Sequence, residues 1–269
     1  MILAGVMLKM GTYGFLRFVL PMFPQAVEQW TPLFMTLGVI GIIYGALVAM
    51  VQVDMKKLVA YSSVSHMGYV VLGLFAMNIY GLQGSLFQML AHGISTGALF
   101  MLVGVIYERT HSRKIAEYGG LAKALPIYAI CFLIVTFSSI AVPMTNGFVG
   151  EFLILFGTFE KSKLFAALAL LGVILGAVYM LWMVKKVFFG ADGPILTKHP
   201  DLKDMNSREL LTITPLIVLI FWMGLFPGFF LKYSEKSMEN LINNKESYNI
   251  RLESAVTPHL HQLGANREL

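Results

Sequence analysis

Long apolar runs separated by short polar stretches dominate the sequence. Runs of about twenty residues are long enough for an α-helix to cross a hydrocarbon core of about 30 Å. Seven such segments lie along the chain, with approximate bounds Ile2–Leu20, Leu33–Val53, Leu58–Met77, Leu82–Tyr107, Ile127–Phe159, Leu164–Phe189 and Leu210–Leu231. The pattern predicts an all-α polytopic membrane protein with about seven transmembrane helices.

The fifth segment is too long for one straight span, and its middle reads VPMTNGFVGEF. Pro143 removes a backbone donor and clashes with the preceding turn, and Asn146 and Gly147 loosen the helix further. Irregular backbone survives at membrane depth only where protein buries it or water hydrates it. Broken helices of this kind serve secondary transporters, whose half-helix ends face the transported ion. The segment therefore predicts a helix broken at Pro143, with Glu151 starting the second half, where the helix dipole favours an anion.

Basic residues gather in the loops on one side of the predicted bundle. They are Lys56, Lys57, Arg109, Arg113, Lys114, Lys123, Lys185, Lys186, Lys198, Lys203 and Arg208. The opposite loops carry Lys161 and Lys163, and further basic residues are scattered in the C-terminal tail. The positive-inside rule then places the N-terminus in the cytoplasm and the C-terminus outside, with the protein in the cell membrane. Because the rule also accounts for the net charge of +5, we expect no nucleic-acid partner.

Composition agrees with a membrane protein and leaves little room for chemistry within the chain alone. The sequence is 57% hydrophobic and 13% charged, whereas soluble domains contain about 25% charged residues. The single cysteine, Cys131, cannot form an internal disulfide, and no metal-ligand cluster or nucleotide-binding fingerprint is present. We therefore expect no cofactor or metal in this chain, a transmembrane bundle over residues 1–235, and a polar tail over residues 236–269.

Lys9 lies in the middle of the first predicted span. A lysine near the bilayer centre costs about 2.5–3.5 kcal/mol on insertion scales. Its side chain could extend to an interface, but Pro21 at the end of the span is roughly 15 Å away along the helix axis. A functional role is the better interpretation of Lys9, whereas Arg17 fits an interfacial anchor.

Polar stripes mark the third and fourth spans. The fourth carries Ser85, Gln88, His92 and Ser95 or Thr96, at steps that place them on one helix face. Histidine accepts and releases protons near neutral pH, so a proton path and plain interhelical hydrogen bonding both fit this stripe. The third carries Ser62, Ser65, His66 and Tyr69 on one face. A structural role and a relay role remain equally open for His66, and Lys56 at the membrane edge fits a topological anchor.

Four stretches carry a resemblance to a known family. They read AGVMLKMGTYGFLRF, DMKKLVAYSSVSHMGYV, QMLAHGISTGALFMLVGVIYERTHSR and NGFVGEFLILFG. Over residues 1 to about 235, they resemble the antiporter-like membrane subunits of respiratory complex I, the proton-pumping NADH:quinone oxidoreductase, in particular its subunit M (chain 4) group. The same superfamily includes Mrp-type cation/proton antiporters and membrane-bound hydrogenase subunits.

The resemblance implies proton translocation coupled to electron transfer in partner subunits. Lys9 is similar to the central lysine that passes protons between two half-channels, and His92 to the histidine of the second half-channel. Glu151 is similar to the terminal acid that faces the neighbouring subunit, and Lys56 and His66 match positions with supporting roles. The implied partners are protons, the lipid bilayer and the other membrane-arm subunits of complex I. NADH, FMN, iron–sulfur clusters and quinone would be bound in partner subunits, and this chain would carry out no redox chemistry itself.

The chain departs from the family pattern in length. Family members have about twice as many spans, arranged as two inverted repeats, and this sequence resembles the second repeat. We expect a truncated or split subunit that does not pump alone. The alternatives are a subunit of an Mrp-type Na⁺/H⁺ antiporter or of a membrane-bound hydrogenase, or an inactive truncated fragment.

Overall fold

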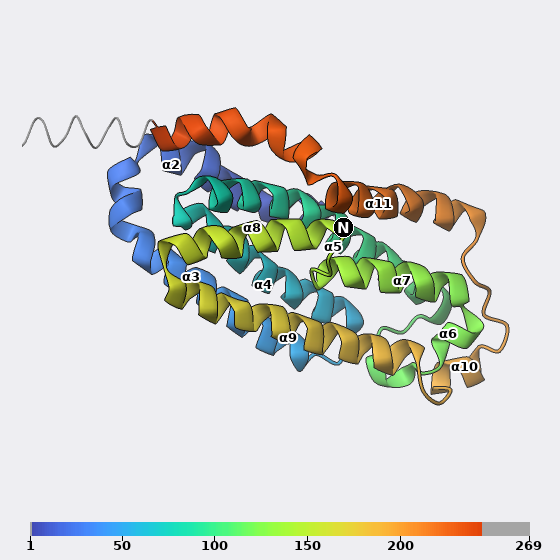
Figure 1. Ribbon diagram of the computed structural model, residues 1–269. Helices are drawn as coiled ribbons and strands as arrows, with labels where there is room; N and C mark the ends of the chain where they lie inside the picture. Colours follow the sequence, from blue (N-terminus) through green and yellow to red (C-terminus); the bar gives the residue numbers. More distant parts are fainter. Residues whose placement is uncertain (1, 244–269) are drawn as a thin grey trace, which may run out of the picture.

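The protein is a bundle of long helices, seen in a computed structural model that describes residues 2–243 (Figure 1). The elements are η1 (Leu3–Met7), α1 (Leu8–Gly14), η2 (Phe15–Val19), α2 (Leu20–Met22), α3 (Pro24–Met50), α4 (Met55–Ala76), α5 (Ile79–Thr110), η3 (Ile115–Glu117), α6 (Leu121–Ala124), α7 (Pro126–Ser139), α8 (Asn146–Lys161), α9 (Lys163–Phe188), α10 (Pro194–Lys198) and α11 (Ser207–Leu225). The first four run on without a break and are together called the first helix (Leu3–Met22). Residues 227–243, here called the C-terminal helix, are also helical.

Six of the seven predicted spans are confirmed as long apolar helices, and the remaining one is divided as predicted. Within residues 2–243, six helices are long and apolar enough to cross a membrane: the first helix, α3, α4, α5, α9 and α11. The remaining span is the broken one, because α7 has 14 residues and α8 has 16, and neither crosses a bilayer alone. The chain is therefore an all-α, multi-pass membrane protein.

Short polar side chains fix where the central helices begin. The Asp54 carboxylate accepts a hydrogen bond from the Lys57 backbone N–H at 3.1 Å and so caps α4. Asn78 caps α5 in the same way, and its amide also donates to the Gly157 carbonyl oxygen of α8 at 2.7 Å. The Asn78 side chain thereby ties the start of α5 to α8.

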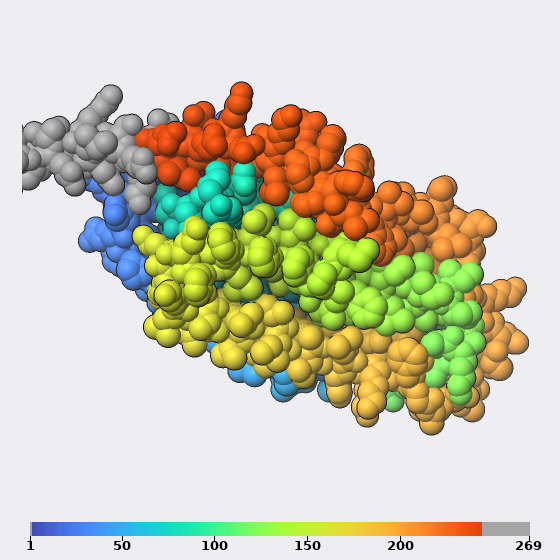
Figure 2. All heavy atoms as spheres, viewed as in Figure 1, coloured from blue at the N-terminus to red at the C-terminus, as the bar shows by residue number. Residues whose placement is uncertain are grey.

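The helices α4 and α5 form the centre of the bundle. In their most apolar windows 78% and 61% of the residues are buried, against 39% or fewer in the other four long spans. Figure 1 shows α4 and α5 between α3 and α9 on one side and α11 on the other, and Figure 2 shows α8 and α9 covering one face. Polar residues on α4 and α5 therefore lie inside the protein rather than in lipid.

The loops predicted to carry most of the positive charge meet at one end of the bundle, where Figure 1 shows α6 and α10. The Ile115 N–H donates to the Val53 carbonyl oxygen at 2.9 Å, and the Gly193 N–H donates to the Gly119 carbonyl oxygen at 3.2 Å. Burial raises the pKa of the Tyr118 hydroxyl in this region to about 12. The helices thus alternate in direction as the sequence predicts.

Two details of the broken span and the last span differ from the sequence predictions. The expectation that Glu151 starts the second half-helix is wrong, because α8 begins at Asn146 and has no acid in its first turn. The last predicted span ends early, since the helix stops at Leu225 and Phe226 leaves helical geometry with φ −124° and ψ 56°. Pro227 then begins a new helix, because proline is tolerated at a first helical position.

The C-terminal helix runs across the boundary predicted between bundle and tail. It lies alongside α2 in Figure 1, and Met238, only 5% exposed, packs in one cluster with Leu16 and Leu20 of the first helix. The predicted polar tail therefore begins with an ordered amphipathic helix. The rest of the tail, residues 244–269, lies outside the described residues.

Candidate functional site

Four of the five residues singled out from the sequence meet at the centre of the bundle. Lys9 comes from the first helix, His66 from α4, His92 from α5 and Glu151 from α8. Their exposed fractions are 7%, 7%, 4% and 4%. Ionisable groups buried at membrane depth are costly unless they pair with one another, so their contacts decide what they can do.

Lys9 and His92 form the first pair. The Lys9 Nζ lies 2.6 Å from His92 Nδ1, and it also donates to the Ala4 carbonyl oxygen one turn earlier. The other ring nitrogen of His92, Nε2, lies 3.0 Å from the Thr96 hydroxyl. Both nitrogens of the imidazole are therefore engaged, and a proton leaving Lys9 has a direct acceptor.

His66 and Glu151 form the second pair. His66 Nδ1 lies 2.8 Å from Glu151 Oε1, and Gln88 Nε2 donates to the same carboxylate oxygen at 3.1 Å. His66 Nε2 and Gln88 Oε1 are buried and have no hydrogen-bond partner in the described part of the chain. His66 and Glu151 can therefore exchange a proton with each other. His66 and Gln88 each keep one polar side-chain atom that could accept or donate a further hydrogen bond.

The two pairs are neighbours without being bonded. The His66 and His92 rings have centroids 5.3 Å apart and planes inclined by 53°, and no hydrogen bond joins them. Lys9, His92, His66 and Glu151 thus form one row of exchangeable groups with a single gap between the two imidazoles. This row is called the buried polar row below.

Close backbone contact between α5 and α8 positions Glu151. A Cβ on Gly150 would lie 2.9 Å from the Gln88 Cα, and one on Gly84 would lie 2.8 Å from the Ile154 backbone nitrogen. Only glycine fits at such contacts, because a methyl group would force the helices apart. The small residues bring the carboxylate of α8 within reach of the amide on α5.

A second polar cluster holds the break between α7 and α8. The Asn146 side-chain oxygen accepts from the Ser138 hydroxyl at 2.5 Å and from the Ser95 hydroxyl at 3.3 Å. Its amide donates to the Ala91 carbonyl oxygen at 3.3 Å, and Asn146 is fully buried. These hydrogen bonds tie the start of α8 to α5 within one turn of His92. They also satisfy polar groups that could not bind water inside a membrane.

The structure separates Lys56 from the buried polar row. Lys56 is exposed at the start of α4, where it lines a cavity of about 520 Å³ with Lys57, Asp54 and Arg113. Arg113 pairs with Asp54 across 3.4 Å. The sequence motif that contains Lys56 and His66 therefore contributes only His66 to the buried row.

Some residues of the site were missed or read differently from the sequence. Gln88 lay on the predicted polar stripe, and its contact with Glu151 follows from that face. Ser138 gave no signal, because a serine at the end of an apolar helix is common and its partner lies eight residues on, beyond the break. Tyr69 shares the face of His66 but donates to the Ala169 carbonyl oxygen at 2.7 Å, a contact between α4 and α9.

No group of three or more His, Cys, Asp or Glu side chains that could hold a metal ion occurs within residues 2–243. The ionisable groups that the fold does gather are two bases with imidazole rings, one amine and one carboxylate. Such a set is suited to binding and passing protons.

Comparison with known proteins identifies the family. A family model described as "NADH:quinone oxidoreductase/Mrp antiporter, TM" matches residues 1–176. The chain belongs to this family. The NADH-ubiquinone oxidoreductase chain 4 of Marchantia polymorpha is 48% identical over 244 residues, and the NADH-quinone oxidoreductase subunit M of Rickettsia prowazekii is 47% identical over 241. Each alignment covers 90% of this chain and 49% of the relative, so the chain spans about half the length of these relatives.

Solved structures share the fold of this chain. A chain of respiratory complex I from Thermus thermophilus with bound NADH superposes with a TM-score of 0.83 at 36% identity, over 89% of this chain and 50% of that one. A chain of the Mrp complex from a Dietzia species superposes with a TM-score of 0.80 at 21% identity, over 89% and 52%. The second likeness concerns the fold alone. The resemblance stated from the sequence motifs is confirmed.

Proposed function

We propose that this chain forms the proton-translocating half of a membrane-arm subunit of a proton-pumping NADH:quinone oxidoreductase. The observation that supports the proposal is the buried polar row, in which Lys9–His92 and Glu151–His66 are paired within hydrogen-bond distance. Kinship with subunit M and chain 4 proteins supports the choice of complex. Electron transfer would take place in partner subunits that bind NADH, FMN, iron–sulfur clusters and quinone.

Each residue of the row has a role in this proposal. Lys9 and Glu151 hold the proton at the two ends, and His92 and His66 pass it between them. Gln88 positions the Glu151 carboxylate. Lys56, at the membrane surface, would deliver protons toward the bundle or simply anchor α4.

The proposed orientation follows from charge. The end of the bundle that carries the loops around α6 and α10 also carries most of the basic residues, and the positive-inside rule assigns that end to the cytoplasm. The N-terminus of the chain is then cytoplasmic, the C-terminus is external, and the protein resides in the cell membrane with the other membrane-arm subunits.

The decisive experiment measures proton pumping and NADH oxidation separately in vesicles that contain the assembled complex. We expect Glu151→Ala and Lys9→Ala each to reduce proton translocation per NADH by about 10²-fold, because each removes a group that transfers the proton. Assembly is checked by the amount of complex recovered, so that a folding defect is not mistaken for a lost relay.

Matched controls lie on exposed parts of the same bundle. Glu160→Ala on α8 and Lys163→Ala on α9 remove exposed side chains of the same types and should leave pumping unchanged. Normal coupling in both Glu151→Ala and Lys9→Ala would sink the proposal. Sodium-dependent proton exchange without NADH would point instead to a cation/proton antiporter.

A further inference from the structure

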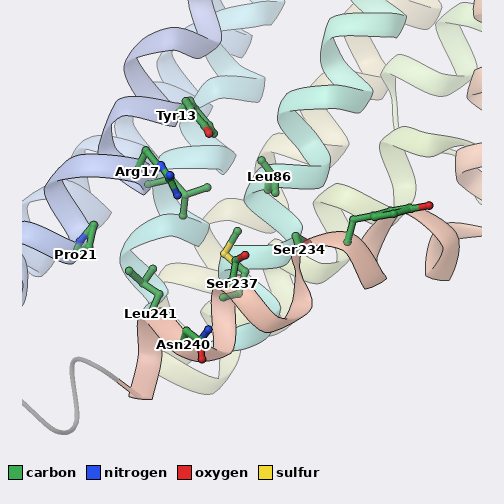
Figure 3. Close-up of a pocket in the computed structure, with 11 residues that line it drawn as sticks. Tyr13, Arg17, Pro21, Leu86, Ser234, Ser237, Asn240 and Leu241 are labelled. Carbon is green, nitrogen blue, oxygen red and sulfur yellow. The ribbon is translucent and has the colours of Figure 1, made fainter.

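The two sides of α5 differ in how their polar surroundings are satisfied. On its outer side, Leu86 lines a polar hollow of about 320 Å³ between the first helix and the C-terminal helix (Figure 3). The Ser234 hydroxyl in the wall of this hollow already donates to the Leu231 carbonyl oxygen at 3.0 Å. Gln88 lies two residues after Leu86, about 200° around the helix, and is only 2% exposed. The polar side chain of interest therefore lies on the inner side of α5.

The Gln88 amide has one bonded end and one unbonded end. Its Nε2 donates to Glu151 Oε1 at 3.1 Å, and its Oε1 is buried without a hydrogen-bond partner among the described residues. Thr136 and Thr158 also have a buried side-chain oxygen of this kind, so an unbonded oxygen alone does not mark a functional group. Gln88 differs from them because the other end of the same amide binds an ionisable side chain.

The two ends of this amide suit different protonation states of Glu151. An ionised carboxylate only accepts hydrogen bonds, whereas a protonated carboxyl group has an O–H that needs an acceptor. The last side-chain torsion of glutamine is roughly two-fold, so a half-turn exchanges the amide oxygen with the amide nitrogen. As observed, Gln88 donates and fits ionised Glu151. After a half-turn, its Oε1 would accept the O–H of protonated Glu151.

Gly150 leaves the space that the unbonded end of the amide occupies. A Cβ on Gly150 would lie 2.3 Å from Gln88 Oε1 and 2.9 Å from Gln88 Cβ, closer than side chains approach one another. Any other residue at this position would collide with the amide. The oxygen and the nitrogen of an amide are nearly alike in size, so the space beside Gly150 suits either end.

His66 is the ionisable side chain that binds Glu151 directly. Its Nδ1 lies 2.8 Å from the carboxylate oxygen that also accepts from the amide. Tyr69 on α4 and Tyr179 on α9 act on the carboxylate through space, and a phenol ordinarily ionises only at about pH 10. On α5 the nearest such group is His92, whose ring lies beside that of His66. Within residues 2–243, no salt bridge joins Glu151 to α7 or α11.

We propose that the Gln88 amide makes a half-turn when Glu151 takes up a proton, so that it binds both forms of that side chain. The inference rests on the proposed relay. When protonated His66 passes its Nδ1 proton to Glu151, the N–H bond breaks and an O–H bond forms at Oε1. His66 is then neutral, with its remaining proton on Nε2. The turned Gln88 accepts the new O–H, so the proton stays on Glu151 instead of returning to His66.

Infrared difference spectroscopy of the protein, in the assembly in which it is isolated, tests the half-turn directly. Glutamine with a heavy isotope at the side-chain carbonyl carbon separates these bands from the backbone, and the band lost in Gln88→Met belongs to Gln88. A carbonyl group that gains a hydrogen bond absorbs at lower frequency. We expect the Gln88 band to move to lower frequency at the pH where a protonated carboxyl band, absent in Glu151→Gln, appears.

Gln52→Met is the matched control for this measurement. The Gln52 amide also donates from Nε2, at 2.9 Å, but its acceptor is the Val48 carbonyl oxygen, which does not titrate. The variant should leave the frequency shift of Gln88 unchanged. A Gln88 band that keeps its frequency while Glu151 takes up a proton would contradict this inference and leave the proposed relay standing. If Glu151 stayed ionised at every pH at which the protein is folded, both would be wrong.

Proton pumping by the assembled complex in vesicles gives a second measurement. Gln88→Met keeps the length of the side chain and removes both hydrogen-bonding ends. We expect it to lower proton translocation per NADH about tenfold, the size of effect of one hydrogen bond to a charged group. Thr136→Val removes an equally buried unbonded oxygen and should leave translocation unchanged. Wild-type translocation by Gln88→Met, at normal recovery of the complex, would overturn the proposal.

Discussion

Two helices of the bundle are interrupted, and their interruptions have different surroundings. Between α7 and α8 the chain leaves helical geometry over residues 140–145, and Ala141 and Met144 adopt positive φ values of 56° and 75°. After α11 only Phe226 intervenes, and its side chain is 64% exposed. The first break is strained and enclosed, whereas the second is short and open.

The two breaks differ in the hydrogen-bond partners of the polar groups at the interruption. At the first break, Asn146 binds two hydroxyls and a carbonyl oxygen of neighbouring segments, all buried. At the second break, the Phe226 N–H still donates to the Trp222 carbonyl oxygen at 3.0 Å, so this backbone donor keeps its helical hydrogen bond. A helix break thus becomes part of a buried polar site when other helices supply its partners, and otherwise it only redirects the chain.

The largest expected effect comes from removing the anchor of the first break. Asn146→Leu removes three buried hydrogen bonds of the Asn146 side chain, each worth about 1 kcal/mol, while the Ser95 and Ser138 hydroxyls remain bonded to each other at 2.6 Å. We expect the free energy of unfolding to fall by about 3 kcal/mol or more, measured by denaturant titration in detergent. Thr36→Leu, at an exposed position of α3, should change it by less than about 0.5 kcal/mol. Wild-type stability in Asn146→Leu would mean that the enclosure of the first break is incidental.

A smaller effect is expected where the two breaks touch. A Cβ on Gly224, near the end of α11, would lie 2.2 Å from the Met144 carbonyl oxygen. Gly224→Ala must therefore push α11 away from the first break, and overpacking of this kind costs about 1–3 kcal/mol. Thermal unfolding should detect the loss.

Gly228→Ala is the matched control for this contact, since nothing lies within 4 Å of a Cβ at Gly228. It should be neutral or slightly stabilising, because alanine favours the helix more than glycine does. If Gly224→Ala were as mild as Gly228→Ala, the two breaks would be independent of each other.

The smallest expected effects are those of the prolines. Pro143→Ala should leave the first break in place, since the polar cluster around Asn146 holds it, and should change stability by about 1 kcal/mol or less. Pro227→Ala should let α11 extend into the C-terminal helix, because no polar cluster opposes it. Spin-label distances across each break measure the angle between the two helices that flank it. If Pro143→Ala straightened the α7–α8 break, the proline and not the polar cluster around Asn146 would hold that break.

The sequence predicts the first break better than the second for a physical reason. Around Pro143 the run contains Asn146 and Gly147, whose polarity and flexibility stand out in an apolar segment. Around Pro227 the sequence GLFPGFFL stays apolar on both sides, so hydropathy extends the span across the proline. The proline itself was the available signal, since the residue before a proline is disfavoured in a helix.

The buried polar row is only partly predictable from the sequence. Burial of Lys9, His92 and Glu151 follows from their place in apolar spans. The contact of His66 with Glu151 does not, because 85 residues separate them and only helix packing brings them together. Lys56 shares a motif with His66 but lies ten residues away, about 15 Å along α4, which is why the motif could not tell which of the two enters the bundle.

The gap between the His66 and His92 rings interrupts the hydrogen-bonded path along the buried polar row. In this conformation no continuous line of hydrogen bonds connects Glu151 to Lys9, because the two ring centroids are 5.3 Å apart, the ring planes are tilted by 53°, and no hydrogen bond joins the rings. A permanent proton path across the membrane would let protons leak back down their gradient. Each proton that leaked across 100 mV would waste about 2.3 kcal/mol. For the proposed relay, this gap means that a turn of one ring or a water molecule between the two rings would be needed before a proton could pass along the whole row.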